Sequence, residues 1–230
     1  MNKLPPVTKN LLIINVLCWM ATMALTKYGI DLRKLLGLHF VLAPGFRIWQ
    51  LVTYLFLHEG FQHIFFNMFA VWMFGRIMEF QWGSKKFLIF YLICGIGAGL
   101  TQELCQFVHW ALVYSHYEVV AIGNGLTIPM AQFLDQILTV GASGAVYGIL
   151  LGYGMTFPDN QLFIIPFPFP IKAKWLVVGY VVLELALGLR NSVADNVAHF
   201  AHLGGMLAGF LVMLYWKHKE RKDNHIKFTW

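Results

Sequence analysis

Charged side chains are scarce in this sequence. Asp, Glu, Lys and Arg make up 12% of the 230 residues, whereas hydrophobic residues make up 58%. With a mean hydropathy of +0.62, so little charge excludes an ordinary soluble domain. Because one crossing of a bilayer takes about 20 residues, a chain of this length accommodates about six helices with short loops. The composition therefore predicts a polytopic membrane protein of the all-α class.

Cysteine is also rare, and the three cysteines, Cys18, Cys94 and Cys105, all lie in apolar segments. Their spacing fits neither a disulfide framework nor a zinc site, so we interpret them as packing residues. The net charge of +6 comes from basic residues that are scattered between apolar runs. Membrane topology explains this scatter better than a nucleic-acid partner, which we do not expect.

The apolar runs divide the chain into spans and connections. The first run follows two lysines, as in a signal peptide, but lacks a convincing cleavage site, so we expect an uncleaved first helix. We expect residues 27–58 to form a structured loop at the membrane surface and 111–140 to form a second long connection. Residues 158–171 contain alternating prolines and should not be helical. The prediction is a single membrane domain, residues 1–230, with spans near residues 10–26, 60–80, 86–110, 142–157, 173–190 and 197–216.

The basic residues also predict an orientation. With the N-terminus inside, most of the 17 lysines and arginines lie on the inner side, and the third loop has none. Since cytoplasmic loops are enriched in Lys and Arg, six spans with both termini cytoplasmic is the consistent solution. The basic tail "KHKERKDNHIK" is then expected at the cytoplasmic face of the membrane.

The second predicted span begins with the polar segment "HEGFQHIFFNM". His63 and Asn67 are four residues apart and share one helix face, whereas His58 falls outside that face on a continuous helix. A zinc protease needs H-E-x-x-H, and here the second histidine comes one residue too late. We therefore expect no metal at this segment.

The fourth predicted span carries Ser143 in "LTVGASGAVYG". Gly144, Gly148 and Gly152 recur every four residues, a pattern that lets helix backbones approach closely. The nucleophile motif G-x-S-x-G of soluble hydrolases does not fit, because Ala145 stands where its second glycine would be. Packing explains the glycines, but it does not require the serine.

The last predicted span contains "NVAHFAHLGGMLAGF", in which His202 lies on the same face as Gly205 and Gly209. If this face packs on the glycines of the fourth span, Ser143 and His202 meet at similar depth, about one to two turns inside parallel helices. They would then act as nucleophile and general base. His199 is a rival base nearer the surface, and its alternative role is to satisfy a neighbouring group.

A third catalytic member is not evident. Asp195 is on the face of His202 but about 10 Å away along the axis, so we expect a Ser-His dyad. His63, Asn67 and the Ser143 backbone N–H are candidate donors to an oxyanion, because their helices enter from the same outer side.

Together these segments resemble the rhomboid family of intramembrane serine proteases. "HEGFQHIFFN" is similar to the family's H-x-x-x-N, "GASGAVYG" to its G-x-S-G and "AHLGGMLAG" to its A-H-x-x-G, in the family's order over residues 49–216. The stretch from Trp49 resembles a loop that lies partly in the membrane, although Gln50 replaces the arginine found in many members. The resemblance implies a nucleophile, Ser143; a base, His202; oxyanion donors, His63 and Asn67; a tyrosine stacked on the base, Tyr147; and supporting glycines, Gly141, Gly144, Gly205 and Gly209.

The resemblance also implies an activity, which is cleavage of transmembrane protein substrates near the outer face of the membrane. The third and fifth loops and the fifth span would form a lid, and water must reach Ser143. It implies membrane lipid as the surroundings, neither metal nor organic cofactor, and a multi-pass location in a bacterial inner membrane.

Two alternatives remain at this stage. A catalytically silent relative would bind membrane helices, although such relatives usually lack the serine or the histidine. A small transporter would use Glu103 and Glu184, which lie inside apolar spans. The other interpretation of these glutamates is hydrogen bonding within the bundle or snorkelling to an interface.

Overall fold

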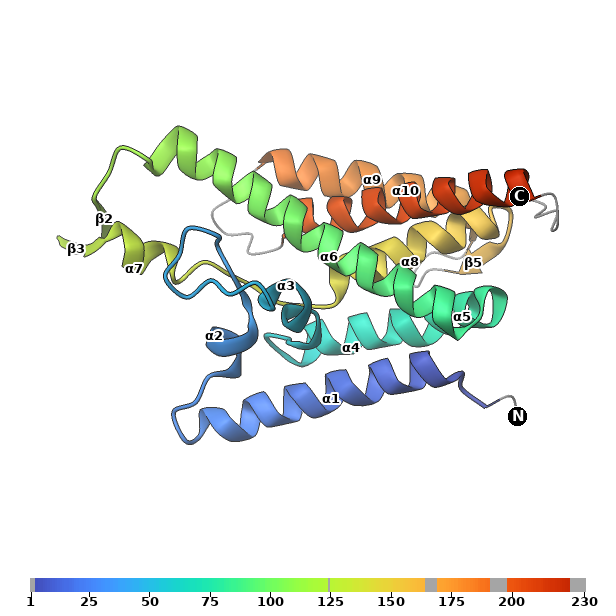
Figure 1. Ribbon diagram of the computed structural model, residues 1–230, viewed down its shortest axis with the longest axis horizontal. Coiled ribbons are helices and arrows are strands. Elements are labelled where there is room, and N and C mark those ends of the chain that lie inside the picture. Colours follow the sequence, from blue (N-terminus) through green and yellow to red (C-terminus); the bar gives the residue numbers. More distant parts are fainter. Residues whose placement is uncertain (1–2, 124, 164–168, 191–197, 224–230) are drawn as a thin grey trace.

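The computed structural model describes residues 3–123, 125–163, 169–190 and 198–223, and it shows a bundle of long helices (Figure 1). Helices α4, α8 and α10 run in one direction, and α1, α6 and α9 run in the other. Each predicted span overlaps one of these helical segments. Their bounds are α1 Pro6–Thr26; α4 Phe61–Ala70, continued by the π-helical turn Val71–Gly75 and by α5 Arg76–Trp82; α6 Ser84–His109, continued by the π-helical turn Trp110–Tyr114; α8 Ser143–Thr156; α9 Ala173–Arg190; and α10 His199–Asp223.

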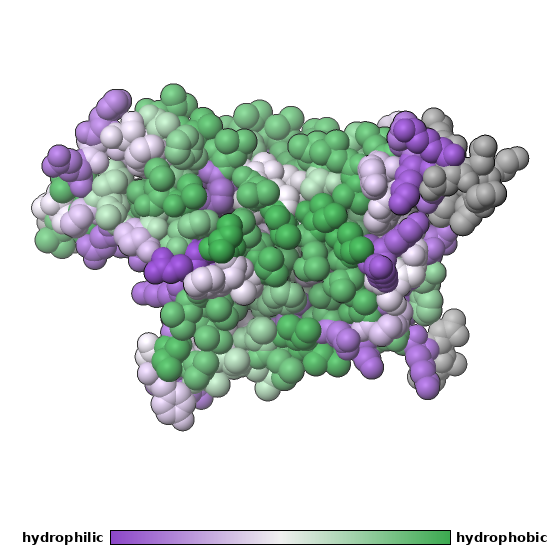
Figure 2. Space-filling model, in the orientation of Figure 1, coloured by the Kyte–Doolittle hydropathy of each residue, from purple (hydrophilic) through white to green (hydrophobic). Residues whose placement is uncertain are grey.

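The surface has the character of a membrane protein. On the face drawn in Figure 2, apolar residues cover the middle of the molecule and hydrophilic residues gather at its two ends. Within the described residues, three helices are long and apolar enough to cross a bilayer, namely Pro6–Thr26, Ser84–Tyr114 and His199–Glu220. The start of α1 and the end of α10 lie at the same end of the bundle (Figure 1). The chain is an integral membrane protein.

The connections between the helices are structured. Two short antiparallel strands, β1 and β4, join the first connection to the third one, where a hairpin, β2–β3, also lies. The proline-rich connection holds an antiparallel pair, β5–β6, so no helix forms in its described part, as predicted. The elements are α2 Leu32–Leu36, β1 Leu38–His39, α3 Gln50–Thr53, the 3-10 turn Tyr54–Phe56, β2 Val119–Gly123, β3 Leu126–Pro129, α7 Met130–Leu134, β4 Leu138–Thr139, β5 Gln161–Phe163 and β6 Pro170–Lys172.

Buried polar groups hold the first connection against the bundle. Glu103 of α6 accepts a hydrogen bond from the Val41 backbone N–H at 2.6 Å. The Tyr54 hydroxyl donates to the Gly95 carbonyl at 2.6 Å. Gln50 is buried, and its Nε2 donates to the Gly45 carbonyl at 3.1 Å. The glutamine that replaces the family's usual arginine therefore serves the internal structure of this loop.

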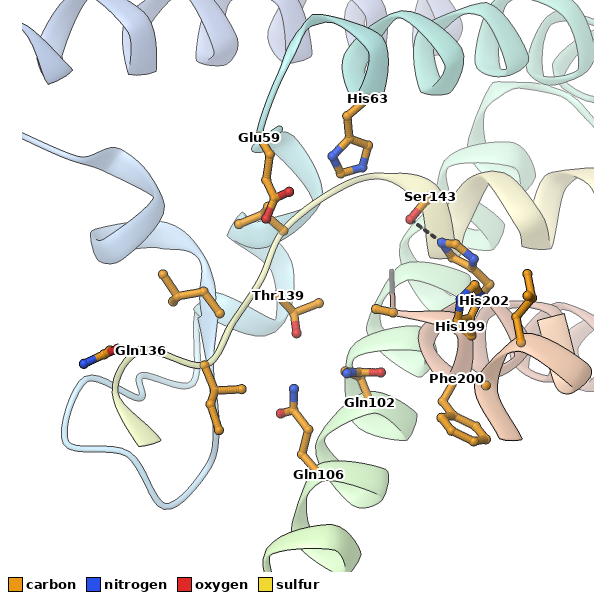
Figure 3. A pocket seen from close by; sticks show the side chains of 16 residues that line it. Glu59, His63, Gln102, Gln106, Gln136, Thr139, Ser143, His199, Phe200 and His202 are labelled. Carbon is orange, nitrogen blue, oxygen red and sulfur yellow. Dashed lines mark hydrogen bonds between the residues drawn. The ribbon is translucent and has the colours of Figure 1, made fainter. Parts of the chain in front are cut away.

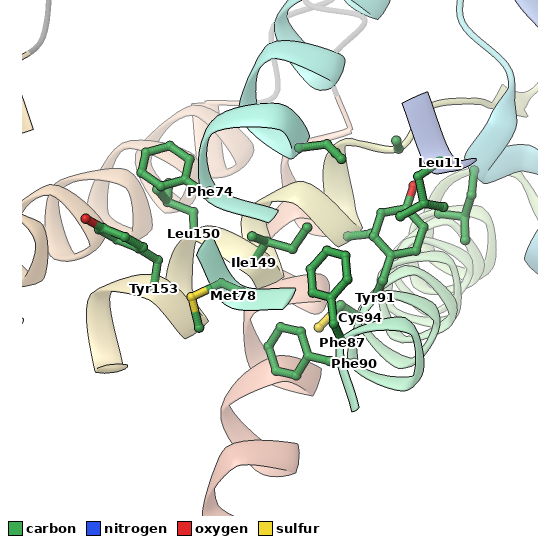
Figure 4. Close-up of a cluster of buried hydrophobic side chains, with 14 of the residues drawn as sticks. Leu11, Phe74, Met78, Phe87, Phe90, Tyr91, Cys94, Ile149, Leu150 and Tyr153 are labelled. Carbon is green, nitrogen blue, oxygen red and sulfur yellow. The ribbon is translucent and has the colours of Figure 1, made fainter. Parts of the chain in front are cut away.

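The core lies where α5, α6 and α8 meet (Figure 4). Phe87, Phe90 and Tyr91 of α6 are fully buried there, together with Ile149 of α8. Cys94 is a free thiol within this cluster, which confirms its assignment as a packing residue. Since lipid is as apolar as these side chains, close van der Waals packing is what holds the helices together.

Glycines set the distance between α8 and α10. A Cβ built on Gly205 would lie 2.0 Å from the Gly144 carbonyl oxygen, and one on Gly209 would lie 3.5 Å from the Gly148 Cα. The predicted contact between these glycine faces is therefore present. Its third predicted member, Gly152, packs instead on Trp82 and on Phe90 of α6. That part of the prediction was wrong because the aromatic rings of Trp82 and Phe90, which also contact Trp216 of α10, occupy the space beside Gly152.

Candidate active site

Ser143 is the first residue of α8. The segment before it is held at this depth because the Gly141 N–H donates to the Tyr54 carbonyl at 3.0 Å. Gly141 has a φ of +126°, a conformation that disfavours any residue with a Cβ. The expected depth of one to two turns does not come from preceding helix, because α8 begins at Ser143 itself and the short strand β4 and Gly141 come before it.

His202 lies in the first turn of α10, and its Nε2 is 2.8 Å from the Ser143 hydroxyl oxygen (Figure 3). The ring of Tyr147, one turn after Ser143, stacks on the imidazole with centroids 4.2 Å apart and planes 12° from parallel. Close packing of α8 on α10 thus brings a hydroxyl, an imidazole and an aromatic face together. A nucleophile and a general base require this spacing.

The α4 residues lie on the other side of the serine. The His63 ring packs against Gly141, where an added Cβ would be 2.6 Å from its Nε2. Asn67 is buried one turn further along, and its Nδ2 has no hydrogen-bond partner among the described residues. His58 contacts His63 edge to face, with ring centroids 4.9 Å apart. The prediction that His58 lies off the face of His63 assumed one continuous helix, which was wrong because α4 begins only at Phe61, after His58.

A cavity of about 750 Å³ opens above Ser143 and His202 (Figure 3). Much of its lining is polar, and Gln102 and Gln106 of α6 reach into it from the side opposite His63. A cavity lined in this way holds water within an otherwise apolar bundle. Hydrolysis at Ser143 is therefore chemically possible.

The structure also brings in a residue that the sequence did not connect with the site. Glu184 of α9 is buried, with its Oε2 3.0 Å from His202 Nδ1 and 2.6 Å from His199 Nδ1. Its Oε1 accepts a hydrogen bond from the Tyr147 hydroxyl. The feature of the sequence that could have pointed to Glu184 was an acidic residue inside an apolar span. His199 thus meets a neighbouring carboxylate, and Asp195 lies outside the described residues.

Within the residues that the structure describes, the side chains of Glu184, His199 and His202 form a group that could hold a metal ion, with ligating atoms within 4.8 Å of one another. Two ligands of a tetrahedral zinc ion lie about 3.3 Å apart, since each bond is about 2.05 Å long. Here the carboxylate oxygen is only 2.6 and 3.0 Å from the two ring nitrogens. The atoms are therefore spaced for direct contact with one another.

Comparison with known proteins agrees with this geometry. A sequence model of the Rhomboid domain matches residues 45–219, which is most of the chain. The chain belongs to the rhomboid family. The matched region contains the serine, both polar α4 residues and the histidine pair of α10.

Several curated rhomboids are similar to this chain. It is 30% identical over 162 residues to RHOMBOID-like protein 6, mitochondrial, of Arabidopsis thaliana, covering 70% of this chain and 41% of the relative. It is 29% identical over 164 residues to Rhomboid protease GluP of Bacillus subtilis, covering 70% and 25%. It is 28% identical over 182 residues to Rhomboid protease AarA of Providencia stuartii, covering 76% and 59%. The chain thus spans less than two thirds of the length of each of these rhomboids.

Proposed function

We propose that this rhomboid is an intramembrane serine protease that hydrolyses peptide bonds in or near transmembrane segments of other membrane proteins. The observation that carries the proposal is the 2.8 Å contact between Ser143 Oγ and His202 Nε2 at the floor of a polar cavity. Relatives named as proteases, GluP and AarA, support the same activity.

The chemistry follows from the positions of these atoms. Ser143 Oγ attacks the scissile carbonyl carbon, and its proton passes to His202 Nε2. The imidazolium then gives that proton to the leaving amine, which breaks the C–N bond and leaves an acyl-enzyme. A water molecule from the cavity hydrolyses the ester, with His202 again as the base. No step requires a metal or an organic cofactor.

We assign the oxyanion site to the side of Ser143 that faces α4. The first N–H groups of a helix lack partners within it, and they carry the positive end of its dipole. Ser143 begins α8, so its backbone N–H is one of these groups. The His63 ring and the unpartnered Asn67 Nδ2 supply further donors from α4.

Asn67→Ala is expected to lower kcat by about 10²-fold with little change in KM, because an oxyanion donor acts mainly in the transition state. Steady-state cleavage of a transmembrane substrate in proteoliposomes measures both constants. Asn15→Ala is the matched control, because Asn15 is equally buried but donates to the Leu11 carbonyl within α1. Equal kcat for both variants would remove Asn67 from the oxyanion site.

The length of α8 supports cleavage inside the membrane. Its 14 residues extend about 21 Å, which is less than the hydrocarbon thickness of about 30 Å. The loop after α8 is charged, and hydrogen bonds from Lys174 and Lys172 hold the pKa of Asp159 below its usual value. With that loop at one membrane surface, Ser143 lies about 9 Å below the other.

The topology that we propose has six crossings within one domain, residues 1–230, and both termini in the cytoplasm. The alternating helix directions and the shared end of α1 and α10 support it. Substrate helices would enter from the lipid beside α9, which buries few of its own residues in the bundle. We propose a bacterial inner membrane as the location, since GluP of Bacillus subtilis is among the relatives.

A substrate panel tests the proposal. The purified protein is reconstituted with labelled single-span proteins and with the same segments as water-soluble peptides. We expect cleavage within or beside the membrane segment, inhibition by a serine-reactive isocoumarin, and no inhibition by EDTA. Cleavage abolished by EDTA, or no cleavage of any membrane segment, would contradict the proposal.

A further inference from the structure

Glu184 is a carboxylate in the middle of α9 that is 3% exposed. A buried carboxyl group is costly in an apolar bundle unless donors surround it. Its donors here come from two other helices, Tyr147 of α8 and the histidines His199 and His202 of α10. Two of these partners are the proposed base and the tyrosine whose ring stacks on that base.

The positions of the protons on His202 decide what its contact with Glu184 can do. If Ser143 is to lose its proton, His202 Nε2 must be free to accept it, so the proton of the neutral ring is on Nδ1. The Nδ1 atom faces Glu184 Oε2 at 3.0 Å. An ionised Glu184 can accept from all three neighbours at once: the Tyr147 hydroxyl, His199 in its Nδ1–H tautomer, and His202 in its Nδ1–H tautomer.

The Nδ1 contact is close but not aligned, since His202 Nδ1 forms no hydrogen bond of good geometry among the described residues. Catalytic hydrogen bonds are often misaligned in free enzymes and tighten when substrate binds. The Tyr147 ring restricts the rotation of the imidazole from its face, with centroids 4.2 Å apart, and Glu184 holds the hydroxyl of that same tyrosine. Glu184 thus restrains the His202 imidazole in two ways. It faces Nδ1 at the edge of the ring, and it holds the hydroxyl of Tyr147, whose ring stacks on the face of the imidazole.

We infer that Glu184 is a positioning residue that completes a Ser143–His202–Glu184 triad, with its acid supplied by α9. It fixes the Nδ1–H tautomer of His202 and balances the positive charge that His202 gains when it takes the Ser143 proton. The inference rests on the proposed function of Ser143 and His202. It goes beyond that function by assigning the Glu184 carboxylate a part in each proton transfer.

Glu184→Gln tests this assignment in the full-length protein. The glutamine keeps the shape but removes the charge, and its amide N–H₂ can face Nδ1 and favour the wrong tautomer. Loss of the acid of a triad by such a change can cost up to about 10⁴-fold, and we expect about 10²–10³-fold in kcat here because the contact is longer and less aligned. KM should change little, because Glu184 contacts the base rather than the substrate.

The pH profile separates positioning from a structural role. Among the described residues, the ionisable groups around His202 are Tyr147 from α8, Glu184 from α9, His199 from α10 and His63 from α4, all of which remain in the variant except the Glu184 carboxylate. Without that negative charge the imidazolium releases its proton more readily. The acidic limb of the pH profile of kcat should therefore move to lower pH in Glu184→Gln. In Glu184→Asp, which keeps the charge, this limb should stay where it is in the wild type.

Glu103→Gln is the matched control, because Glu103 is also buried in a helix but accepts a hydrogen bond from the Val41 backbone N–H and does not line the cavity at Ser143. Its pH profile should match the wild type.

The rate of labelling of Ser143 by a fluorophosphonate, followed against pH, gives the same information without a substrate. If Glu184→Gln keeps the wild-type kcat and pH profile while Ser143→Ala is inactive, the triad assignment is wrong; if Ser143→Ala remains active, the proposed function itself is wrong. If Glu184→Gln does not fold, the pH profile of Glu184→Asp decides. The aspartate keeps the negative charge, so an acidic limb of kcat that moves as far as expected for loss of that charge would overturn the inference.

Discussion

Replacing Ser143 with alanine is expected to reduce cleavage of transmembrane substrates by at least about 10⁴-fold. The alanine removes the hydroxyl that, within the part of the chain that the structure describes, lies 2.8 Å from His202 Nε2, and without this nucleophile no acyl-enzyme forms at this site. Single-turnover cleavage in proteoliposomes, with enzyme in excess over substrate, measures the loss directly.

Ser115→Ala is the control for this change. The Ser115 hydroxyl donates to the Ala111 carbonyl on an exposed surface, so its removal should leave the cleavage rate unchanged. Residual cleavage by Ser143→Ala at more than about one hundredth of the wild-type rate would mean that another group performs the attack.

Gly205→Ala is expected to cause the largest loss through packing. The new Cβ would lie 2.0 Å from the Gly144 carbonyl oxygen, whereas an ordinary contact is 3.4 Å or more. Because backbone atoms cannot rotate aside, α10 must move away from α8 and carry His202 away from Ser143. Overpacking of this kind costs about 1–3 kcal/mol of stability, and a displacement of about 1 Å at the dyad can cost 10²-fold in rate.

Gly179→Ala provides the matched comparison, since Gly179 is also helical but its added Cβ would meet nothing within 4 Å. Thermal unfolding in detergent and cleavage in proteoliposomes should place Gly179→Ala at or above the wild type in Tm and Gly205→Ala below it in both measurements. If the two variants behave alike, the glycine contact does not position the dyad.

The sequence predicts much of this architecture because membrane helices are long and uniform. The apolar runs locate the helical segments, and the spacing of Gly144 and Gly148 against Gly205 and Gly209 predicts a close crossing that the structure contains. A helix periodicity is a local property, so it can be read from one segment. The placement of Ser143 beside His202 follows from two such local patterns.

Contacts among several helices could not be predicted in the same way. Glu184 has no sequence spacing that relates it to His202, because the two residues lie on different helices and helix periodicity does not extend from one helix to the next. His58 was misplaced because the start of α4 depends on the extended conformation of Gly60. Gly152 was misplaced because its neighbours, Trp82 and Phe90, come from other helices. Each miss reflects a tertiary arrangement that periodicity does not encode.

These predictions depend on one claim, that Ser143 is a nucleophile activated by His202. The most direct measurement is to label the reconstituted protein with a fluorophosphonate, digest it and locate the adduct by mass spectrometry. We predict one adduct, on Ser143 Oγ, and no labelling of Ser143→Ala or His202→Ala. An adduct on another residue, or undiminished labelling of His202→Ala, would contradict the claim.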